Sequence, residues 1–319
     1  MQARAAIGER ALALANRVTK TEFDQVHANN EGNQDMKNAT ILTLVSKDVS
    51  EDQLLPLIDS ARANDAHLSV LALGATPQVP VYAANIQPYA AAILPDDWQK
   101  DFLVENAALT ATAKEVGALL QREAVSGDVS VLNCDPARIA PRVARRAVVC
   151  DLCVLTPGLR AREDVFHPAL QGVLFESPVA AVLNFETVKT PAKPDRVFVA
   201  WDAGLPSARA VQRAMAMLRQ AREVTIGIFD PVMTENRDGE NPGSDLAEWL
   251  SRHGCNVQVN QYPSGGKEIG DCIVGRAKET GADLVIMGAY GHSRLREDLF
   301  GGTTRTMIAQ RELAVLLAH

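Results

Sequence analysis

The sequence of 319 residues is poor in aromatic residues, which make up 5% of it, and no apolar run approaches the ~20 residues that span a bilayer. It has no excess of positive charge, because the net charge is -7. It also lacks a basic stripe with interleaved aromatics, so a nucleic-acid surface is not expected. The N-terminus lacks the uninterrupted apolar core of a secretion signal. We therefore expect a cytoplasmic protein with no membrane or nucleic-acid partner.

The five cysteines are odd in number and scattered, which does not indicate a disulfide framework. Cys150 and Cys153 form a C-x-x-C pattern, but Cys153 begins an apolar run and is expected within a strand. No second cysteine pair or histidine stands nearby. We therefore expect these thiols to pack in the core rather than to serve a redox or zinc site.

The chain repeats itself, and its length favours two domains. Residues 128–155 and 256–287 each read as a strand, an amphipathic helix and a buried strand introduced by Asp-Leu. Each copy begins with an apolar strand, over 41–45 and 197–201. Strands that alternate with helices at this spacing predict an α/β fold of two tandem doubly wound, Rossmann-like parallel-sheet domains related by internal duplication.

Composition also gives the expected boundaries. A polar, proline-bearing linker occupies residues 188–195 and separates a first domain over 38–187 from a second over 196–319. Residues 1–37 precede any strand and form an extension with partly helical character. Within the second domain, Ser244 suits the N-cap of a helix that runs to about residue 253.

A glycine-rich stretch follows the apolar strand that ends near Met287. It comprises Gly288, Gly291, Gly301 and Gly302, followed by Thr303 and Thr304. Where a strand leads into a helix, unpaired N–H groups and the helix dipole favour an anion, and glycine lets a phosphate approach because it has no Cβ. The alternative is that these glycines only make tight turns.

With its flanking residues, this pattern of Gly-x2-Gly-x9-Gly and small hydroxylated residues resembles the universal stress protein family over about residues 38–319. The resemblance implies ATP binding, with or without magnesium, by the second domain. It implies that Asp202 contacts the adenosine and that Gly227 and Ile228 form a wall for the adenine. The ribose and triphosphate would lie against Met287, Gly288, Gly291, Gly301, Gly302, Thr303 and Thr304. Gly302 departs from the family, because ATP-binding members usually carry Ser or Thr there.

The first copy has lost these features. Thr156 replaces the first glycine, Pro157 removes an amide donor, and Ser46 falls where the second copy has Asp202. We expect this copy not to bind ATP by the same route. Asp202 also has an alternative role, since Asp202-Ala203-Gly204 can form a turn and a helix entry.

Three functions are compatible with the sequence. The leading one is a stress-response regulator that binds an adenine nucleotide. The second is a scaffold without catalysis that binds another small ligand or a protein, with Tyr82, Tyr89 and Trp98 in a loop lining a pocket. The third is slow ATP hydrolysis, for which no catalytic residues stand out. Because domains of this family often pair through their last strands, we also expect a pseudo-twofold pairing of the two copies, and a possible homodimer.

Overall fold

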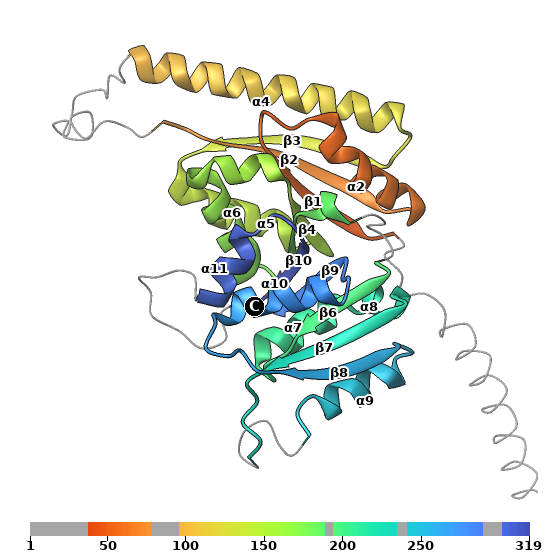
Figure 1. Ribbon diagram of the computed structural model, residues 1–319. Coiled ribbons are helices and arrows are strands. Elements are labelled where there is room, and N and C mark those ends of the chain that lie inside the picture. The colour runs from red at the N-terminus through yellow and green to blue at the C-terminus, as the bar shows by residue number, and fades with distance from the viewer. Residues whose placement is uncertain (1–37, 78–95, 189–193, 235–240, 290–301) are drawn as a thin grey trace, which may run out of the picture.

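The computed structural model describes residues 38–77, 96–188, 194–234, 241–289 and 302–319. Its ten strands form one continuous sheet in the order β3-β2-β1-β4-β5-β10-β9-β6-β7-β8. The expected N-terminal extension, Tyr82 and Tyr89 lie outside the described residues. Figure 1 shows the first half of the chain above and the second half below, with the sheet running through both.

The first half of the sheet alternates strands and helices in chain order. Its elements are β1 (Thr40–Val45), α2 (Glu51–Ala63), β2 (His67–Ala75), α4 (Asp96–Arg122), β3 (Gly127–Cys134), η1 (Pro136–Arg138), α5 (Ile139–Ala147), β4 (Leu152–Leu155), η2 (Pro157–Ala161), α6 (Glu163–Glu176), β5 (Ala180–Leu183) and η3 (Phe185–Thr187).

The second half repeats this alternation. Its elements are β6 (Arg196–Ala200), α7 (Leu205–Arg213), α8 (Met215–Gln220), β7 (Glu223–Phe229), α9 (Ser244–Arg252), β8 (Val257–Tyr262), α10 (Ile269–Glu279), β9 (Leu284–Gly288), α11 (Gly302–Ala309) and β10 (Ala314–Ala318).

Within each half all strands are parallel, and the order reverses between the first and the fourth strand. This is the doubly wound arrangement that the sequence predicts, so the expected fold class is confirmed. The two half-sheets meet where β5 and β10 pair antiparallel, with Leu183 opposite Val315 and Ala181 opposite Leu317.

The duplication extends to the register of the strands. Ile41 lies opposite Leu152 in the first half, and Val197 lies opposite Leu284 in the second. Thr40 likewise pairs with His67, as Arg196 does with Glu223. Counting from these pairs, Ser46 occupies the position of Asp202, and Thr156 that of Gly288. The residue-by-residue comparison of the two copies therefore holds in three dimensions.

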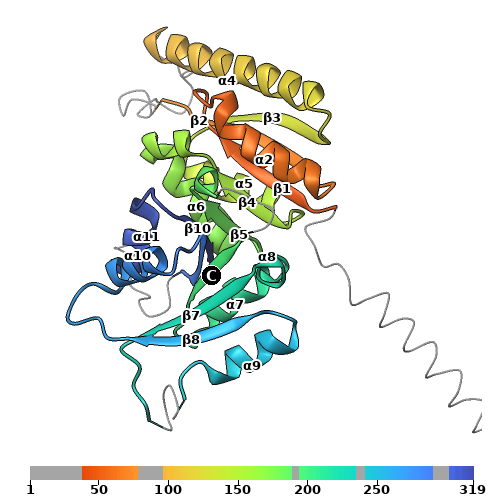
Figure 2. The same cartoon turned by 45° about the vertical axis from the view of Figure 1, so that its right-hand side comes forward.

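Helices cover both faces of the sheet, which gives three layers (Figure 2). One core lies under α2, α4, α7, α8 and α9, and the other under α5, α6, α10 and α11. Strands buried on both faces explain the near-continuous aliphatic runs in the sequence. Helix α4 is 27 residues long, but no helix of the described residues is both long and apolar enough to cross a membrane.

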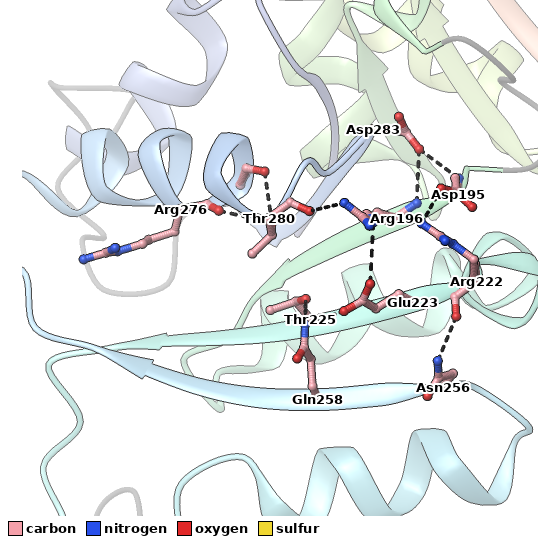
Figure 3. A network of polar contacts seen from close by, with 11 residues as sticks. Asp195, Arg196, Arg222, Glu223, Thr225, Asn256, Gln258, Arg276, Thr280 and Asp283 are labelled. Carbon is pink, nitrogen blue, oxygen red and sulfur yellow. Dashed lines mark hydrogen bonds and ion pairs between the residues drawn. The ribbon is translucent and has the colours of Figure 1, made fainter.

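The aspartate of each Asp-Leu pair fixes the start of a neighbouring strand. Asp283 Oδ2 accepts the backbone N–H groups of Asp195 (2.9 Å) and Arg196 (3.1 Å), as Figure 3 shows. In the first half, Asp151 Oδ2 accepts the N–H of Thr40 at 2.8 Å. The backbone N–H of each aspartate donates in return to the carbonyl of Arg196 or Thr40. The first and fourth strands of each half are therefore locked in register where they begin.

Two expectations about helix starts are wrong. Trp98 lies not in a loop but in the first turn of α4, where it stacks on Phe102 and its indole N–H donates to the carbonyl of Pro77. Ser244 is the first helical residue rather than the N-cap, because Gly243 takes the cap position with a φ of 81°. Such a φ favours glycine over serine.

We predict that Asp283→Ala lowers the free energy of unfolding by about 1–2 kcal/mol, because two amides lose a charged acceptor. Asp151→Ala removes the acceptor of one amide and should cost about half as much. Denaturant unfolding of both variants measures the difference. A larger loss for Asp151→Ala would contradict this account of the strand starts.

Candidate functional site

Two of the residues expected to bind a ligand, Asp202 and Gly288, lie where the strand order reverses in the second half. Strands β6 and β9 are parallel neighbours with Ala200 opposite Met287, so the segments after them leave the sheet side by side. Asp202 follows β6, and Gly288 ends β9. In doubly wound sheets, the crevice beyond such a pair of strand ends is where ligands bind.

Asp202 forms the turn that leads into α7. Its Oδ1 accepts the N–H of Gly204 at 2.8 Å and the hydroxyl of Ser207 at 2.6 Å. The role in helix entry that the sequence left open is therefore present. Asp202 is exposed, and Oδ2 has no hydrogen-bond partner among the described residues. One oxygen holds the turn while the other can still accept a hydrogen bond from a ligand.

Gly288 lets the first turn of α7 sit directly on the end of β9. A Cβ at this position would lie 2.6 Å from the carbonyl carbon of Pro206, and closer still to the backbone nitrogen of Ser207. Backbone atoms cannot move aside as a side chain can. The sequence singled out Gly288 for phosphate approach, and the structure adds a second reason, the contact between a helix and a strand.

Three other expected residues, Gly227, Ile228 and Met287, are buried. A Cβ on Gly227 would collide with the ring of Phe198, and the Gly227 carbonyl accepts the N–H of Trp201. Ile228 and Met287 are buried, on opposite sides of the sheet. For Gly227 the structure thus gives a packing reason that involves no ligand.

The N-terminus of α11 carries the last expected group. Gly302 is exposed and begins the helix, Thr303 is half-buried, and Thr304 is buried in the helix's inner face. Among the described residues, a Cβ on Gly302 would meet Glu268 Oε2, at 3.3 Å. Gly291 and Gly301 lie outside the described residues. No sequence pattern indicates Glu268, because this carboxylate reaches α11 from the start of another helix, α10.

At the equivalent strand ends of the first half lies an ion cluster. Glu105, from α4, accepts hydrogen bonds from Lys47 Nζ at 2.7 Å and from Arg162 Nη1 at 2.9 Å. Lys47 follows β1, and Arg162 follows β4 through η2, so the three side chains span the reversal point. Gly74 on β2 allows α4 to approach, since a Cβ there would meet Leu109 at 2.6 Å.

The Glu105 side chain is 12% exposed. Burial by itself would raise its pKa, but the hydrogen bonds from Lys47 and Arg162 outweigh burial, so the pKa lies below the ordinary 4.5. The charged form is therefore stabilised by its two partners. No sequence pattern predicted the cluster, because its members are far apart along the chain.

Ser46 and Thr156, which replace the binding groups in the first half, are both buried. Thr156 is buried, and its hydroxyl donates to the carbonyl of Leu44 at 3.0 Å. A Cβ on Gly158 would lie 2.5 Å from Ser46 Oγ. The turn after β4 therefore packs against the turn after β1, at the position where the second half has Asp202 and Gly288.

The C-x-x-C cysteines lie as the sequence predicts. Cys153 is buried inside β4, and burial raises its pKa well above the ordinary value. Cys150 precedes the strand, and its thiol donates to the carbonyl of Arg146 at 3.3 Å. Within the described ranges, no group of three or more potential metal ligands occurs. Buried thiols with raised pKa values are poor nucleophiles.

The architecture is that of tandem doubly wound domains with ligand crevices at strand ends, and solved structures give its class. A universal stress protein from Archaeoglobus fulgidus DSM 4304 covers 90% of this chain and 98% of its own, at 16% sequence identity and a TM-score of 0.60. The chain therefore has the fold of the universal stress proteins. The resemblance seen in the sequence is confirmed at the level of the fold.

Two further structures are more distant. A protein of unknown function from Pseudomonas aeruginosa PAO1 covers 88% of this chain and 92% of its own, at 17% identity and a TM-score of 0.48. A universal stress protein in complex with cAMP covers 40% of this chain and 96% of its own, at 20% identity and a TM-score of 0.31. No protein-family model and no curated protein matches the sequence.

We predict that Gly288→Ala destabilises the protein by about 1–3 kcal/mol, because the added methyl group meets the backbone of α7. The matched control is Gly275→Ala in α10, where a Cβ meets nothing within 4 Å. That change should stabilise by about 0.5–1 kcal/mol, as expected for Gly to Ala within a helix. Equal effects in thermal unfolding would rule out the close approach of α7.

We predict that Glu105→Gln lowers the free energy of unfolding by about 1–3 kcal/mol at neutral pH, because two cations lose their partner. Glu248→Gln removes a surface pair with Arg252, in which Glu248 is 65% exposed, and should cost less than about 0.5 kcal/mol.

The Glu105 contribution should depend on pH. Because its folded pKa is lowered, the contribution is complete above 4.5 and is lost as the pH falls through the folded value. The gap between wild type and Glu105→Gln should therefore close in acid. A gap that stays constant with pH would show that the charge is not involved.

Proposed function

We propose that the protein is a cytoplasmic stress-response regulator and that the second half of its sheet binds ATP. The observation that carries the proposal is the difference between the equivalent strand ends of the two halves. In the first half, Glu105 and its two cations lie across the strand ends. In the second half, the same position presents the exposed Asp202, with one carboxylate oxygen that has no partner among the described residues.

The helix that follows β9 supports the anion-binding part of the proposal. It begins at Gly302, an exposed residue without a Cβ. The first turn of a helix attracts phosphate through its free donors and the helix dipole. Thr303 is half-buried at the same turn and can add a hydroxyl donor.

In this arrangement, Asp202 accepts hydrogen bonds from the nucleoside, and Ile228 contributes to the apolar base of the adenine site. Gly288, Gly302 and Thr303 receive the phosphates, and Gly291 and Gly301 belong to the same proposed loop. A magnesium ion would be held mainly by the triphosphate itself, which fits the preference of Mg²⁺ for phosphate oxygens.

Glu268 opposes this binding in part. Its carboxylate lies beside Gly302, at the N-terminus of α11, where a phosphate would also go. A resident carboxylate weakens the attraction of the helix terminus for a second anion. We therefore infer a modest affinity that depends on magnesium, which neutralises part of the phosphate charge.

A second candidate function is a scaffold that binds a ligand other than a nucleotide. Glu268 beside the helix terminus and the glycine at position 302 are the observations that favour it. The two candidates differ in one measurement, because only the first requires saturable ATP binding at this edge.

We predict that the full-length protein binds ATP saturably in the presence of magnesium, measured by isothermal titration calorimetry. Gly302→Asp should weaken binding at least tenfold, since it places a negative charge at the phosphate position. Gly302→Asn is the matched control, because it has nearly the same shape without the charge. Gly302→Ser should strengthen binding by about fivefold, the equivalent of about 1 kcal/mol for one added hydrogen bond.

Both Gly302→Asp and Gly302→Asn are expected to fold, because the neighbouring atom is the flexible end of Glu268. An acidic residue in the first turn also stabilises a helix. Absence of saturable binding by the wild-type protein would overturn the proposal in favour of the scaffold. ATP binding of equal strength in Gly302→Asp and Gly302→Asn would place the phosphates elsewhere.

A further inference from the structure

A hollow of about 540 Å³ lies between the two halves of the chain, away from the crevice described above. It is formed by the end of α6, the connection to β5, the end of β10 and one side of α7. Its lining includes two buried residues, Val179, just before β5, and Ala318, at the end of β10. None of its lining residues is among those proposed to hold ATP.

Two arginines one helical turn apart, Arg209 and Arg213, line the hollow from α7. Helix α7 contains no acidic residue, and both arginines are exposed. No ion pair in the described part of the chain includes either of them. Like charges at this spacing repel and slightly destabilise a helix. The stability of α7 therefore does not explain why both arginines lie on the side of the helix that lines the hollow.

The opposite wall of the hollow is partly apolar. Phe175 is 40% exposed there, and its ring lies 4.7 Å from that of His319, centroid to centroid. Burial lowers the pKa of His319, and the positive charge of Arg209 lowers it further. The imidazole is therefore neutral at neutral pH and adds a polar but uncharged edge. Glu176 is the one acidic lining residue, and no ion pair joins it to Arg209 or Arg213.

We propose that this hollow is a second ligand site, which takes a small phosphate ester with an aromatic or apolar group. The two guanidinium groups bind the phosphoryl oxygens, for which their planar donor arrangement is suited. The apolar group lies against Phe175. Because α6 belongs to the first half and α7 to the second, the ligand contacts both halves at once.

The test uses phenyl phosphate as the probe, with ligand-observed NMR on the full-length protein. Inorganic phosphate tests the charge alone, and phenol tests the ring alone. Phenyl phosphate should bind saturably, at least fivefold more tightly than either fragment. The double variant Arg209→Gln/Arg213→Gln should weaken its binding at least tenfold. Circular dichroism should show that this variant is folded, since the change removes a repulsion and no ion pair.

The matched control is Arg219→Gln, an exposed arginine on α8 outside the hollow, which should change binding less than twofold. Absence of saturable binding would overturn the proposal, as would equal losses in the control and the double variant. Binding of phenyl phosphate should also survive Gly302→Asp, whereas ATP binding should survive Arg209→Gln/Arg213→Gln. Loss of both ligands in either variant would refute two separate sites.

Discussion

The contact between the first turn of α7 and the end of β9 is the constraint on which the second half of the structure depends. Gly288 makes it possible, because any Cβ there would collide with the backbone at Pro206 and Ser207. Ser207 in turn donates to Asp202, which fixes the turn after β6. Because Gly288 has no side chain, α7 can lie against the end of β9, and the Asp202 carboxylate is held beside these strand ends. The packing reason and the binding reason for this glycine are compatible.

The two halves have the same strand arrangement but different side chains at the equivalent strand ends. Their strand registers are the same, so Ser46 and Thr156 stand where Asp202 and Gly288 stand in the second half. The difference arises from what covers them. Helix α4 is three times as long as α9, and it brings Glu105 over the reversal point to meet Lys47 and Arg162. These partly buried charges stabilise one another, so the cluster holds the three segments together.

Much of the fold could be predicted from the sequence, because it depends on local patterns that occur twice. The aliphatic strands and the Asp-Leu pairs are local patterns that occur in both halves. The convergence of Asp202 with Gly288 follows from the strand order that these patterns predict. The ion cluster could not be predicted, since Glu105 lies 58 residues from Lys47 and 57 from Arg162. The position of Glu268 beside Gly302 could not be predicted for the same reason, because it depends on the packing of α10 beside α11. The packing role of Gly227 could not be predicted either, since it depends on Phe198 filling the space beside it.

The antiparallel contact of β5 with β10 decides which surfaces the two halves share. Parallel strands expose their carboxyl ends at one edge, so an antiparallel junction turns the candidate crevice of one half away from that of the other. The same junction brings the start of β5 beside the end of β10, where side chains from α6 and α7 face each other across the hollow. Neither half alone could form that surface. A ligand there would add its binding free energy to the association of the halves, whereas a ligand in the crevice of the second half would stabilise that half alone.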